Sequence, residues 1–233
     1  MILSDGEIRV FKDKLVDPFI DDNVQPASID LTLDREFIVF QPHMVRAIDL
    51  RNPDSFASLG KKVVIEDGGE FIIHPREFVL AATEERVTLP DNIAGRLEGK
   101  SSLARVGLII HATGGFIDPG FRGPITLEMS NWMPAPIILR PGDLICQVSF
   151  QFLMTAAKNP YKGRYQNANG VEASKYGLKN IDGRYASEDS ELDIPAANSG
   201  WSGAPELSSN HPAIGNLSKE ELDESGYDGP MVK

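Results

Sequence analysis

The sequence predicts an all-β fold of the barrel or jelly-roll type. The chain of 233 residues contains 21 glycines and 16 prolines, a turn-rich composition that favours many short strands over long helices. Short apolar or alternating segments recur along the chain and are separated by turn sequences, as in barrels and jelly rolls. The sequence shows neither a regular alternation of strands with helices nor an internal repeat.

The first expected element is a short N-terminal helix. Ser4 and Glu7 have the spacing of a capping box, in which each side chain accepts a hydrogen bond from the backbone of the other. Ile8 and Phe11 would lie on the apolar face of this helix, which we expect to end near Asp13.

The strands are expected where apolar residues alternate or cluster between turns. Residues 25–33 alternate, with Ile29, Leu31 and Leu33 on one face, which predicts a half-buried strand. Further strands are predicted at residues 36–40, 62–65, 70–73, 77–82, 93–97, 125–130, 137–139 and 144–152. Residues 51–60 are predicted to form a loop, and the Arg-Pro-Gly-Asp sequence at residues 140–143 is predicted to form a turn.

Composition divides the chain into three parts. We expect a β-barrel domain at residues 1–158, a polar and aromatic arm at residues 159–180, and an acidic, flexible tail at residues 181–233. The tail carries eleven acidic and three basic residues, and so most of the net charge of −11. Residues 218–222 within it are predicted to form a short helix.

Charge, hydropathy and cysteine content exclude several classes of protein. The net charge of −11 argues against a nucleic-acid partner, which requires a basic surface. No apolar run approaches the roughly 18 residues that span a bilayer, and no basic segment follows Met1, so neither a membrane partner nor a signal peptide is expected. The single cysteine, Cys146, excludes an intramolecular disulfide and indicates a reducing, cytoplasmic setting.

A glycine-bounded turn at residues 99–105 has groups suited to a phosphate. Ser101 could cap a short helix and leave its own backbone N–H and that of Ser102 directed at an anion. Lys100 adds a positive charge, and Arg105 would reach the same site from one helical turn further on. The alternative is an ordinary strand-to-helix turn. A P-loop is excluded, because the glycine spacing is one residue short and no nucleotide-type βαβ unit surrounds it.

Two acidic residues follow this turn. Asp118 lies in the segment 113–123, whose four glycines and one proline predict a hairpin with close backbone approach. Its carboxylate could accept hydrogen bonds from a sugar hydroxyl, or it could form an Asx turn. Glu128 shares one strand face with Thr126 and Ser130, where it could transfer protons or simply face solvent.

The residue pattern argues against zinc. Zinc-dependent deaminases need a His-x-Glu motif and a Pro-Cys-x-x-Cys pair, whereas this chain has one cysteine and four histidines without metal-ligand spacing. It also lacks the Gly-x-Ser-x-Gly nucleophile motif. Any hydrolysis here is expected to use a water activated by glutamate, with no transition metal held by the protein.

The motifs together resemble the dCTP deaminase family, a branch of the trimeric dUTPase superfamily. They are Gly-Lys-Ser-Ser-Leu-Ala-Arg at residues 99–105, His-Ala-Thr-Gly-Gly-Phe-Ile-Asp-Pro-Gly-Phe-Arg-Gly at residues 111–123, and Ile-Thr-Leu-Glu at residues 125–128. The resemblance covers about residues 1–180. It implies a distorted β-barrel or jelly roll of the dUTPase type, a homotrimer with active sites between subunits, and a C-terminal arm that closes over the nucleotide.

The resemblance also implies roles for individual residues in binding dCTP or dUTP. Glu128 would take a proton from water and return it to the leaving amine, while Ser101 and Arg105 would position water and base. Asp118 would bind the deoxyribose 3′-hydroxyl. The base would be lined by Thr126, Leu127 and Glu128, and the triphosphate held by Lys100, Ser101, Ser102, Leu103, Ala104, Arg105, Gln147, Tyr161 and Arg164. Mg²⁺ would be held by the phosphates, in accord with its preference for few protein ligands.

Two forms of the family exist, and three departures from its pattern stand out. One form stops at dUTP, whereas the other also cleaves the triphosphate to dUMP and pyrophosphate; Gly115 and Phe116 resemble the second, bifunctional form. Gly114 stands where alanine is usual, Arg164 where lysine is usual, and Ala168 where glutamine is expected. The alternatives to a deaminase are a plain dUTP pyrophosphatase and a catalytically silent trimer that binds nucleotides.

Overall fold

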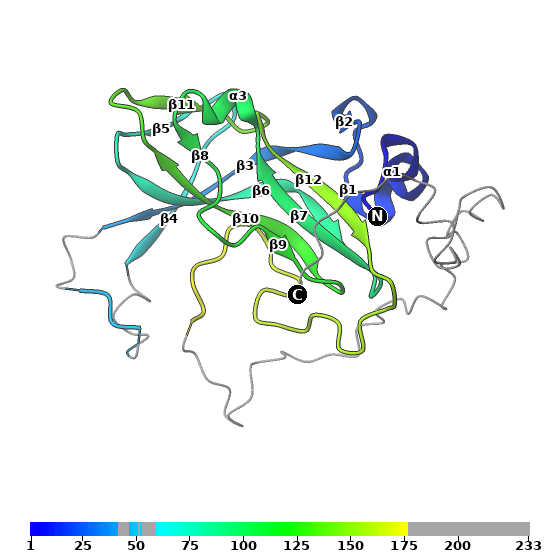
Figure 1. The fold of residues 1–233 in the computed structure, drawn as a ribbon. Coiled ribbons are helices and arrows are strands. Elements are labelled where there is room, and N and C mark those ends of the chain that lie inside the picture. Colours follow the sequence, from blue (N-terminus) through cyan, green and yellow to red (C-terminus); the bar gives the residue numbers. More distant parts are fainter. Residues whose placement is uncertain (42–46, 51, 53–58, 177–233) are drawn as a thin grey trace, which may run out of the picture.

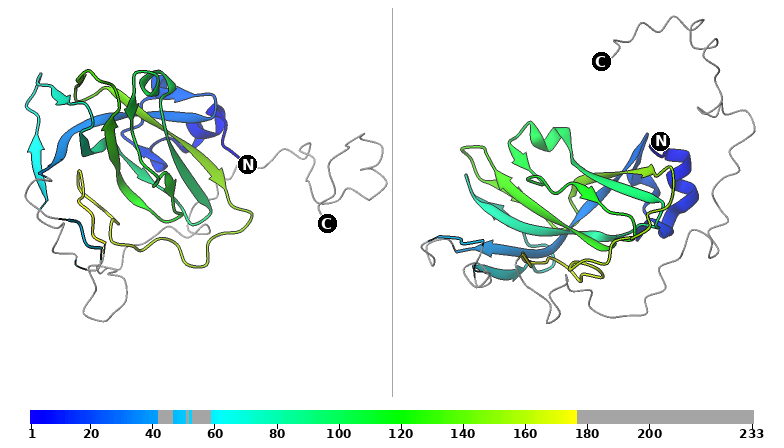
Figure 2. Two further views of the ribbon diagram at one scale, coloured as in Figure 1. Left: turned by 60° about the vertical axis from the view of Figure 1, so that its left-hand side comes forward. Right: turned by 60° about the horizontal axis from the view of Figure 1, so that its bottom comes forward.

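The computed structural model describes residues 1–41, 47–50, 52 and 59–176, whose strands form a strongly curled sheet (Figures 1 and 2). Ten strands of the described residues share this sheet, and its main path runs β8-β10-β6-β3-β12-β7-β9. The strands of the sheet are β1 (Val16–Asp17), β2 (Val24–Gln25), β3 (Ser28–Phe40), β4 (Gly60–Val64), β6 (Phe78–Thr88), β7 (Ile93–Gly99), β8 (Leu108–Ile109), β9 (Phe116–Ile117), β10 (Arg122–Asn131) and β12 (Leu144–Phe152). A second, two-stranded sheet pairs β5 (Phe71–Ile73) with β11 (Ile137–Leu139). The predicted all-β fold is therefore confirmed.

The helix α1 (Asp5–Phe11) forms as its capping sequence predicts. The Ser4 N–H donates to Glu7 Oε2 at 2.8 Å, and the Glu7 N–H donates to Ser4 Oγ at 3.4 Å, so both halves of the capping box are present. Ile8 and Phe11 are buried. The α-helix ends before the predicted Asp13, because residues 12–14 tighten into a 3-10 helix.

Strand β3 is longer than the sequence indicates. Its 13 residues join two predicted strands, at residues 25–33 and 36–40, into one. Its first half pairs with β12 and its second half with β4, and its pairing with β6 shifts register between Leu33 and Phe37. The polar residues Asp34–Glu36 at this irregularity interrupt the apolar alternation, which is why the sequence predicts a break there.

Strand β6 also extends beyond its prediction. The predicted strand ends at Ala82, whereas β6 continues through a Thr-Glu-Glu-Arg sequence to Thr88. In this polar stretch Glu85 is buried, and its carboxylate accepts hydrogen bonds from the N–H and the hydroxyl of Thr32 on β3, each at 2.9 Å. A buried acid of this kind gives no apolar signal, so the sequence alone does not reveal the strand.

The predicted hairpin at residues 113–123 is wrong. Strand β9 pairs with β7, whereas β10 pairs with β6 and β8, so the strands on either side of the Asp118 turn do not pair with each other. Because β9 and β10 lie toward opposite ends of the strand path, this segment carries the chain across the open side of the curled sheet. Glycine and proline content predicts a turn here, but not which strands it joins.

The main apolar core draws on α1 and on all the long strands of the sheet. Its fully buried side chains include Ile8, Leu31, Phe37, Leu97, Leu127 and Phe150. Phe37 also stacks on Phe71 with ring centroids 4.2 Å apart, which attaches the small β5–β11 sheet to the barrel. Burial of each large apolar side chain contributes about 1.5–3 kcal/mol, so this core holds the strands that carry the site.

Some predictions fall outside the described residues. They concern the tail at residues 181–233, its helix at residues 218–222, and most of the loop at residues 51–60. Within the described part of the chain, every helix is too short or too polar to cross a membrane.

Candidate functional site

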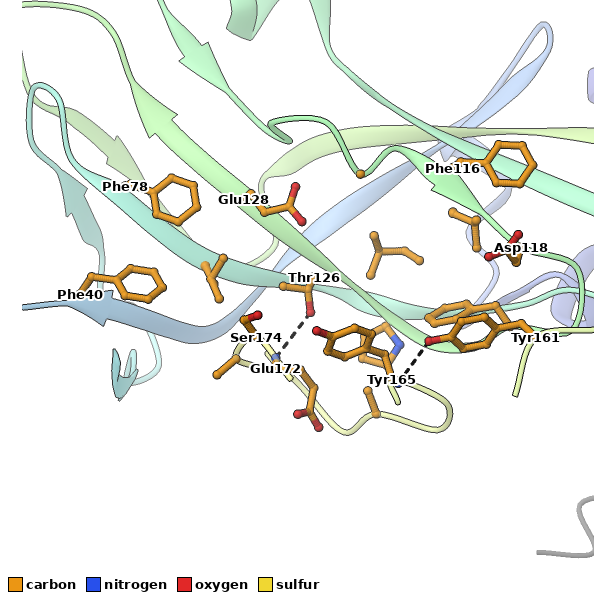
Figure 3. Close-up of a pocket in the computed structure, with 18 residues that line it drawn as sticks. Phe40, Phe78, Phe116, Asp118, Thr126, Glu128, Tyr161, Tyr165, Glu172 and Ser174 are labelled. Carbon is orange, nitrogen blue, oxygen red and sulfur yellow. Dashed lines mark hydrogen bonds between the residues drawn. The ribbon is translucent and has the colours of Figure 1, made fainter. Parts of the chain in front are cut away.

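A pocket of about 610 Å³ lies between strand β10, the Asp118 turn and the arm (Figure 3). Strand β10 contributes Thr126 and Glu128, and the turn after β9 contributes Asp118. The described part of the arm, residues 159–176, contributes Tyr161 and Tyr165. We call this region the carboxylate pocket, because the fold brings both predicted acidic residues to it.

The alternation predicted for β10 is confirmed. Thr126, Glu128 and Ser130 are half-buried on one face, and the residues between them are buried on the other. The side chain of Leu127 is fully buried in the core, so Leu127 can face a ligand in the pocket only through its backbone.

The carboxylate of Glu128 is held against the chain that follows β8. Its Oε2 accepts a hydrogen bond from the Ala112 N–H at 3.3 Å. Gly114 lies beside it, so close that a methyl group built there would be 3.5 Å from Oε1. On β6, Leu80 is the cross-strand partner of Glu128 and lines the same pocket. One carboxylate oxygen is thus oriented by a backbone amide, in a pocket with an apolar wall.

The other end of the carboxylate pocket contains Asp118 and Tyr161. Asp118 is exposed, and the ring of Tyr161 packs against Phe121 with centroids 5.7 Å apart. The Tyr161 hydroxyl accepts a hydrogen bond from the Tyr165 N–H at 3.2 Å. Burial, reinforced by the nearby Tyr165 and Asp118, raises the pKa of Tyr161 still further above neutrality, so its hydroxyl is protonated at neutral pH, as an ordinary tyrosine is, and can donate a hydrogen bond.

The arm is fixed to the barrel by Gln166, a residue that the sequence motifs do not single out. The Gln166 amide donates to the Gly120 carbonyl at 2.7 Å and accepts from the Arg122 N–H at 2.9 Å. Arg86 on β6 also donates to the carbonyl of Ala168 at 3.0 Å. The Gln166 bonds tie the arm to the turn that carries Asp118, and the Arg86 bond ties it to β6.

The two ends of the arm are joined to each other. Arg164 donates to the backbone carbonyl of Lys175, and Lys175 Nζ donates to the carbonyl of Arg164 at 3.0 Å. The Tyr165 hydroxyl accepts from the Lys175 N–H at 3.0 Å. Arg164, a predicted phosphate ligand, therefore serves here to close the arm on itself.

A second group of predicted site residues lies around Lys100. Lys100 forms an ion pair with Asp30 on β3, whose side chain is only 3% exposed. Gln147 on β12 accepts from the Ser28 hydroxyl at 2.9 Å, and its amide donates to the Gly99 carbonyl at 3.4 Å. We call Lys100, Asp30, Gln147 and Ser28 the lysine cluster; it unites two of the predicted phosphate ligands.

The turn beside the lysine cluster differs from its prediction. The short helix α3 (Ser101–Ala104) begins at Ser101, so Lys100 and not Ser101 occupies the N-cap position. No side chain caps this helix, because the ammonium group of Lys100 has no acceptor for a backbone N–H; it is paired with Asp30 instead. Ser101, Ser102 and Arg105 are exposed, so their polar groups are accessible to another molecule.

The carboxylate pocket and the lysine cluster lie apart within one chain. Among the described residues, those that line the pocket include neither Gln147 nor any residue of 100–105. In Figure 1, α3 lies at the top of the sheet and the arm lies below it. A single chain therefore does not assemble all the predicted site residues.

Buried polar groups next to the lysine cluster were not predicted as part of any site. Burial raises the pKa of Glu85 on β6, although hydrogen bonds from Thr32 oppose the shift. Burial, with the nearby Glu85 and Asp30 charges, likewise raises the pKa of the Cys146 thiol. Within the described ranges, no three His, Cys, Asp or Glu side chains are grouped so that they could hold a metal ion.

Comparison with known proteins shows which proteins this chain resembles. A family model described as dCTP deaminase-like matches residues 2–153. A dCTP deaminase of Haloarcula marismortui is 45% identical over 184 residues, which are 75% of this chain and 94% of that protein. A dUMP-forming dCTP deaminase of Streptomyces coelicolor is 48% identical over 185 residues, which are 75% of this chain and 95% of that protein.

The fold is similar to a solved structure as well. The crystal structure of 2′-deoxycytidine 5′-triphosphate deaminase from Agrobacterium tumefaciens matches with a TM-score of 0.51 and 26% sequence identity. The match covers 64% of this chain and 46% of that one, so this chain corresponds to less than half of the solved protein.

Proposed function

The chain belongs to the dCTP deaminase-like family, and on this basis we propose that it deaminates dCTP and then releases pyrophosphate to give dUMP. The observation that carries the proposal is the carboxylate pocket, in which Glu128 and Asp118 face one cavity of about 610 Å³. A cavity of this size is in the range that holds a small-molecule ligand.

Glu128 is the proposed proton carrier. Its carboxylate takes a proton from a water molecule, the resulting hydroxide adds to C4 of cytosine, and the proton passes to the amine that leaves as ammonia. The hydrogen bond from Ala112 supports this role, because it fixes one oxygen and leaves the other directed to the pocket. The reaction needs no zinc, and the absence of a zinc-deaminase motif in the sequence accords with that.

Asp118 and Tyr161 are the proposed sugar-binding end of the site. The exposed Asp118 carboxylate can accept a hydrogen bond from the 3′-hydroxyl of deoxyribose. The Tyr161 hydroxyl, which is protonated at neutral pH, is a donor beside it. Thr126 lines the cavity between the two ends, where the base would lie.

The triphosphate would be bound by a second copy of the chain in a homotrimer. Lys100, Arg105 and Gln147 do not line the carboxylate pocket of their own chain among the described residues, so they can join it only from another copy. Mg²⁺ would enter with the substrate, bound to the phosphates. Mg²⁺ commonly binds through substrate phosphates and few protein ligands.

The release of pyrophosphate is proposed from Gly115 and Phe116. A side chain at Gly115 would lie 2.8 Å from the Leu97 carbonyl, so only glycine fits there. Phe116 is 62% exposed and lines the pocket. The dUMP-forming activity named for the Streptomyces coelicolor relative supports the bifunctional form.

Product analysis tests the proposal. The full chain is incubated with dCTP and Mg²⁺, and ammonia and nucleotides are measured by chromatography. We expect ammonia and dUMP; dUTP as the end product would restrict the protein to deamination. Turnover of dUTP but not dCTP would indicate a plain pyrophosphatase, and binding without turnover would indicate a silent trimer.

A further inference from the structure

The adjacent residues Gly114 and Gly115 differ in the space that the fold leaves for a side chain. A side chain at Gly115 would meet the Leu97 carbonyl at 2.8 Å and the His111 ring at 3.1 Å, so packing excludes any larger residue. A side chain at Gly114 would meet only the two Glu128 carboxylate oxygens, at 3.5 and 3.9 Å, which is ordinary van der Waals contact. The φ angle of Gly114 is not positive either. The fold would therefore accept alanine at Gly114.

The space at Gly114 is part of the carboxylate pocket. Gly114 and Glu128 both line the cavity, and so do the apolar residues Phe40, Phe78 and Leu80. Figure 3 shows Phe40 and Phe78 on one side of Glu128, with Asp118 and Tyr161 at the opposite end of the pocket. The cavity thus continues beyond the proposed proton carrier as an apolar space.

The two ends of the pocket orient the base. With the sugar near Asp118 and C4 at Glu128, the edge of the pyrimidine around C4 faces the apolar end. The carboxylate itself must reach the C4 amine, so a substituent on that nitrogen would come between the reacting groups. The neighbouring ring atom C5 makes no such contact, and an apolar group on C5 is suited to an apolar wall.

We propose that Gly114 is a specificity-determining residue that lets the site deaminate 5-methyl-dCTP as well as dCTP. The proposal rests on the proposed deaminase function and adds a substrate class to it. The reaction is the same: water forms a C4–O bond, the C4–N bond breaks, and the proton that Glu128 takes from water leaves with ammonia. The product of this step is thymidine triphosphate in place of dUTP.

The test compares two substrates across three proteins. Values of kcat/KM are measured for dCTP and 5-methyl-dCTP with the full chain, with Gly114→Ala and with Gly6→Ala, by ammonia release and nucleotide chromatography. Gly6→Ala adds the same methyl group at an exposed position of α1, which contributes no residue to the lining of the pocket, and is the matched control.

For the unmodified chain we expect the methylated substrate to be used almost as efficiently as dCTP, with the two specificity constants within about tenfold of each other. Gly114→Ala should lower the ratio of 5-methyl-dCTP to dCTP by about tenfold or more, since a methyl group in an apolar pocket changes discrimination by about 10–200-fold. Gly6→Ala should leave the ratio unchanged.

Several outcomes would overturn the inference. They are a wild-type ratio below about one tenth, an equal loss on both substrates in Gly114→Ala, or turnover of N4-methyl-dCTP in preference to 5-methyl-dCTP. If Gly114→Ala does not fold, the wild-type ratio alone decides. No turnover of dCTP by the unmodified chain would instead refute the proposed function, so the two failures are distinguishable.

Discussion

The carboxylate pocket and the lysine cluster both contain acidic side chains, but they differ in how far these carboxylates are buried and paired. In the pocket, Glu128 is only half-buried and Asp118 is exposed, so each carboxylate can reach a ligand. In the cluster, Asp30 is buried and its charge is balanced by Lys100. The pocket therefore has carboxylates that a ligand can reach, whereas the carboxylate of the cluster is held in a buried ion pair.

The pairing of Lys100 also bears on the proposed phosphate binding. Because Asp30 offsets the Lys100 charge, the exposed Arg105 is the better placed of the two residues to supply positive charge to a phosphate. Variants in the pocket should thus change catalysis with little effect on stability, whereas variants in the cluster should lower stability in addition to any effect on the proposed phosphate binding. Four experiments test this contrast, from the largest expected effect to the smallest.

Glu128→Gln should abolish deamination and leave the fold intact. The amide cannot accept a proton from water, so kcat for ammonia release should fall by about 10²–10⁴-fold. Isothermal titration should still detect binding of dUTP. Ser130→Ala, on the same strand face but outside the pocket lining, is the control and should keep normal turnover. Retained deamination in Glu128→Gln would remove the proton carrier from the mechanism.

Lys100→Met should lower the free energy of unfolding by about 3–5 kcal/mol, because it leaves the buried Asp30 carboxylate without a cation and with only the hydrogen bond from the Gln25 amide. Asp30→Asn should cost less, since Lys100 is 23% exposed and water can solvate its ammonium group. Urea unfolding at one fixed protein concentration measures both. Equal costs for the two variants would contradict the assignment of the cluster as a buried charge pair with one solvated end.

Gln166→Ala should loosen the arm without unfolding the barrel. It removes two hydrogen bonds to the Asp118 turn, so KM for dCTP should rise by about tenfold while the free energy of unfolding changes little. Asn169→Ala, at an exposed position of the same arm, is the control. An unchanged KM in Gln166→Ala would show that the arm does not depend on this anchor.

Glu85 should produce the smallest effect, a pH dependence of stability. Burial raises its pKa above the ordinary value of 4.5, so the folded state favours the protonated carboxyl. The corresponding stability is complete below pH 4.5 and is lost as the pH rises through the raised pKa. Glu85→Gln should flatten this dependence in urea unfolding from pH 4.5 upward, and the exposed neighbour Glu84→Gln should not. If the free energy of unfolding of Glu85→Gln still falls with rising pH, the pH dependence comes from another group.

Local patterns in the sequence predict local features well. The Ser4–Glu7 capping box starts α1, and the alternation around Glu128 places that side chain on the correct face of β10. Strand β12 (Leu144–Phe152) has the bounds that the sequence predicts. Each of these features depends on residues a few positions apart, so the sequence contains the information needed to predict it.

Features that depend on distant partners were not predictable in this way. The anchor role of Gln166 depends on the Asp118 turn, more than forty residues away, and the buried position of Glu85 depends on Thr32. The Asp118 turn has the composition of a hairpin, yet its flanking strands pair with other strands. Neither apolar periodicity nor turn composition reports which strands become neighbours.

The sequence by itself determined the all-β fold, the family, and the facing of Glu128. Only the tertiary structure decided that Glu128 and Asp118 share one pocket while Lys100 and Gln147 lie apart from it. It also showed that neither the backbone conformation nor the packing at Gly114 requires a glycine. The physical reason is that the periodicity of apolar residues indicates which side of a strand is buried. The separation of the carboxylate pocket from the lysine cluster instead follows from the pairing of strands that are distant in the sequence around the curled sheet.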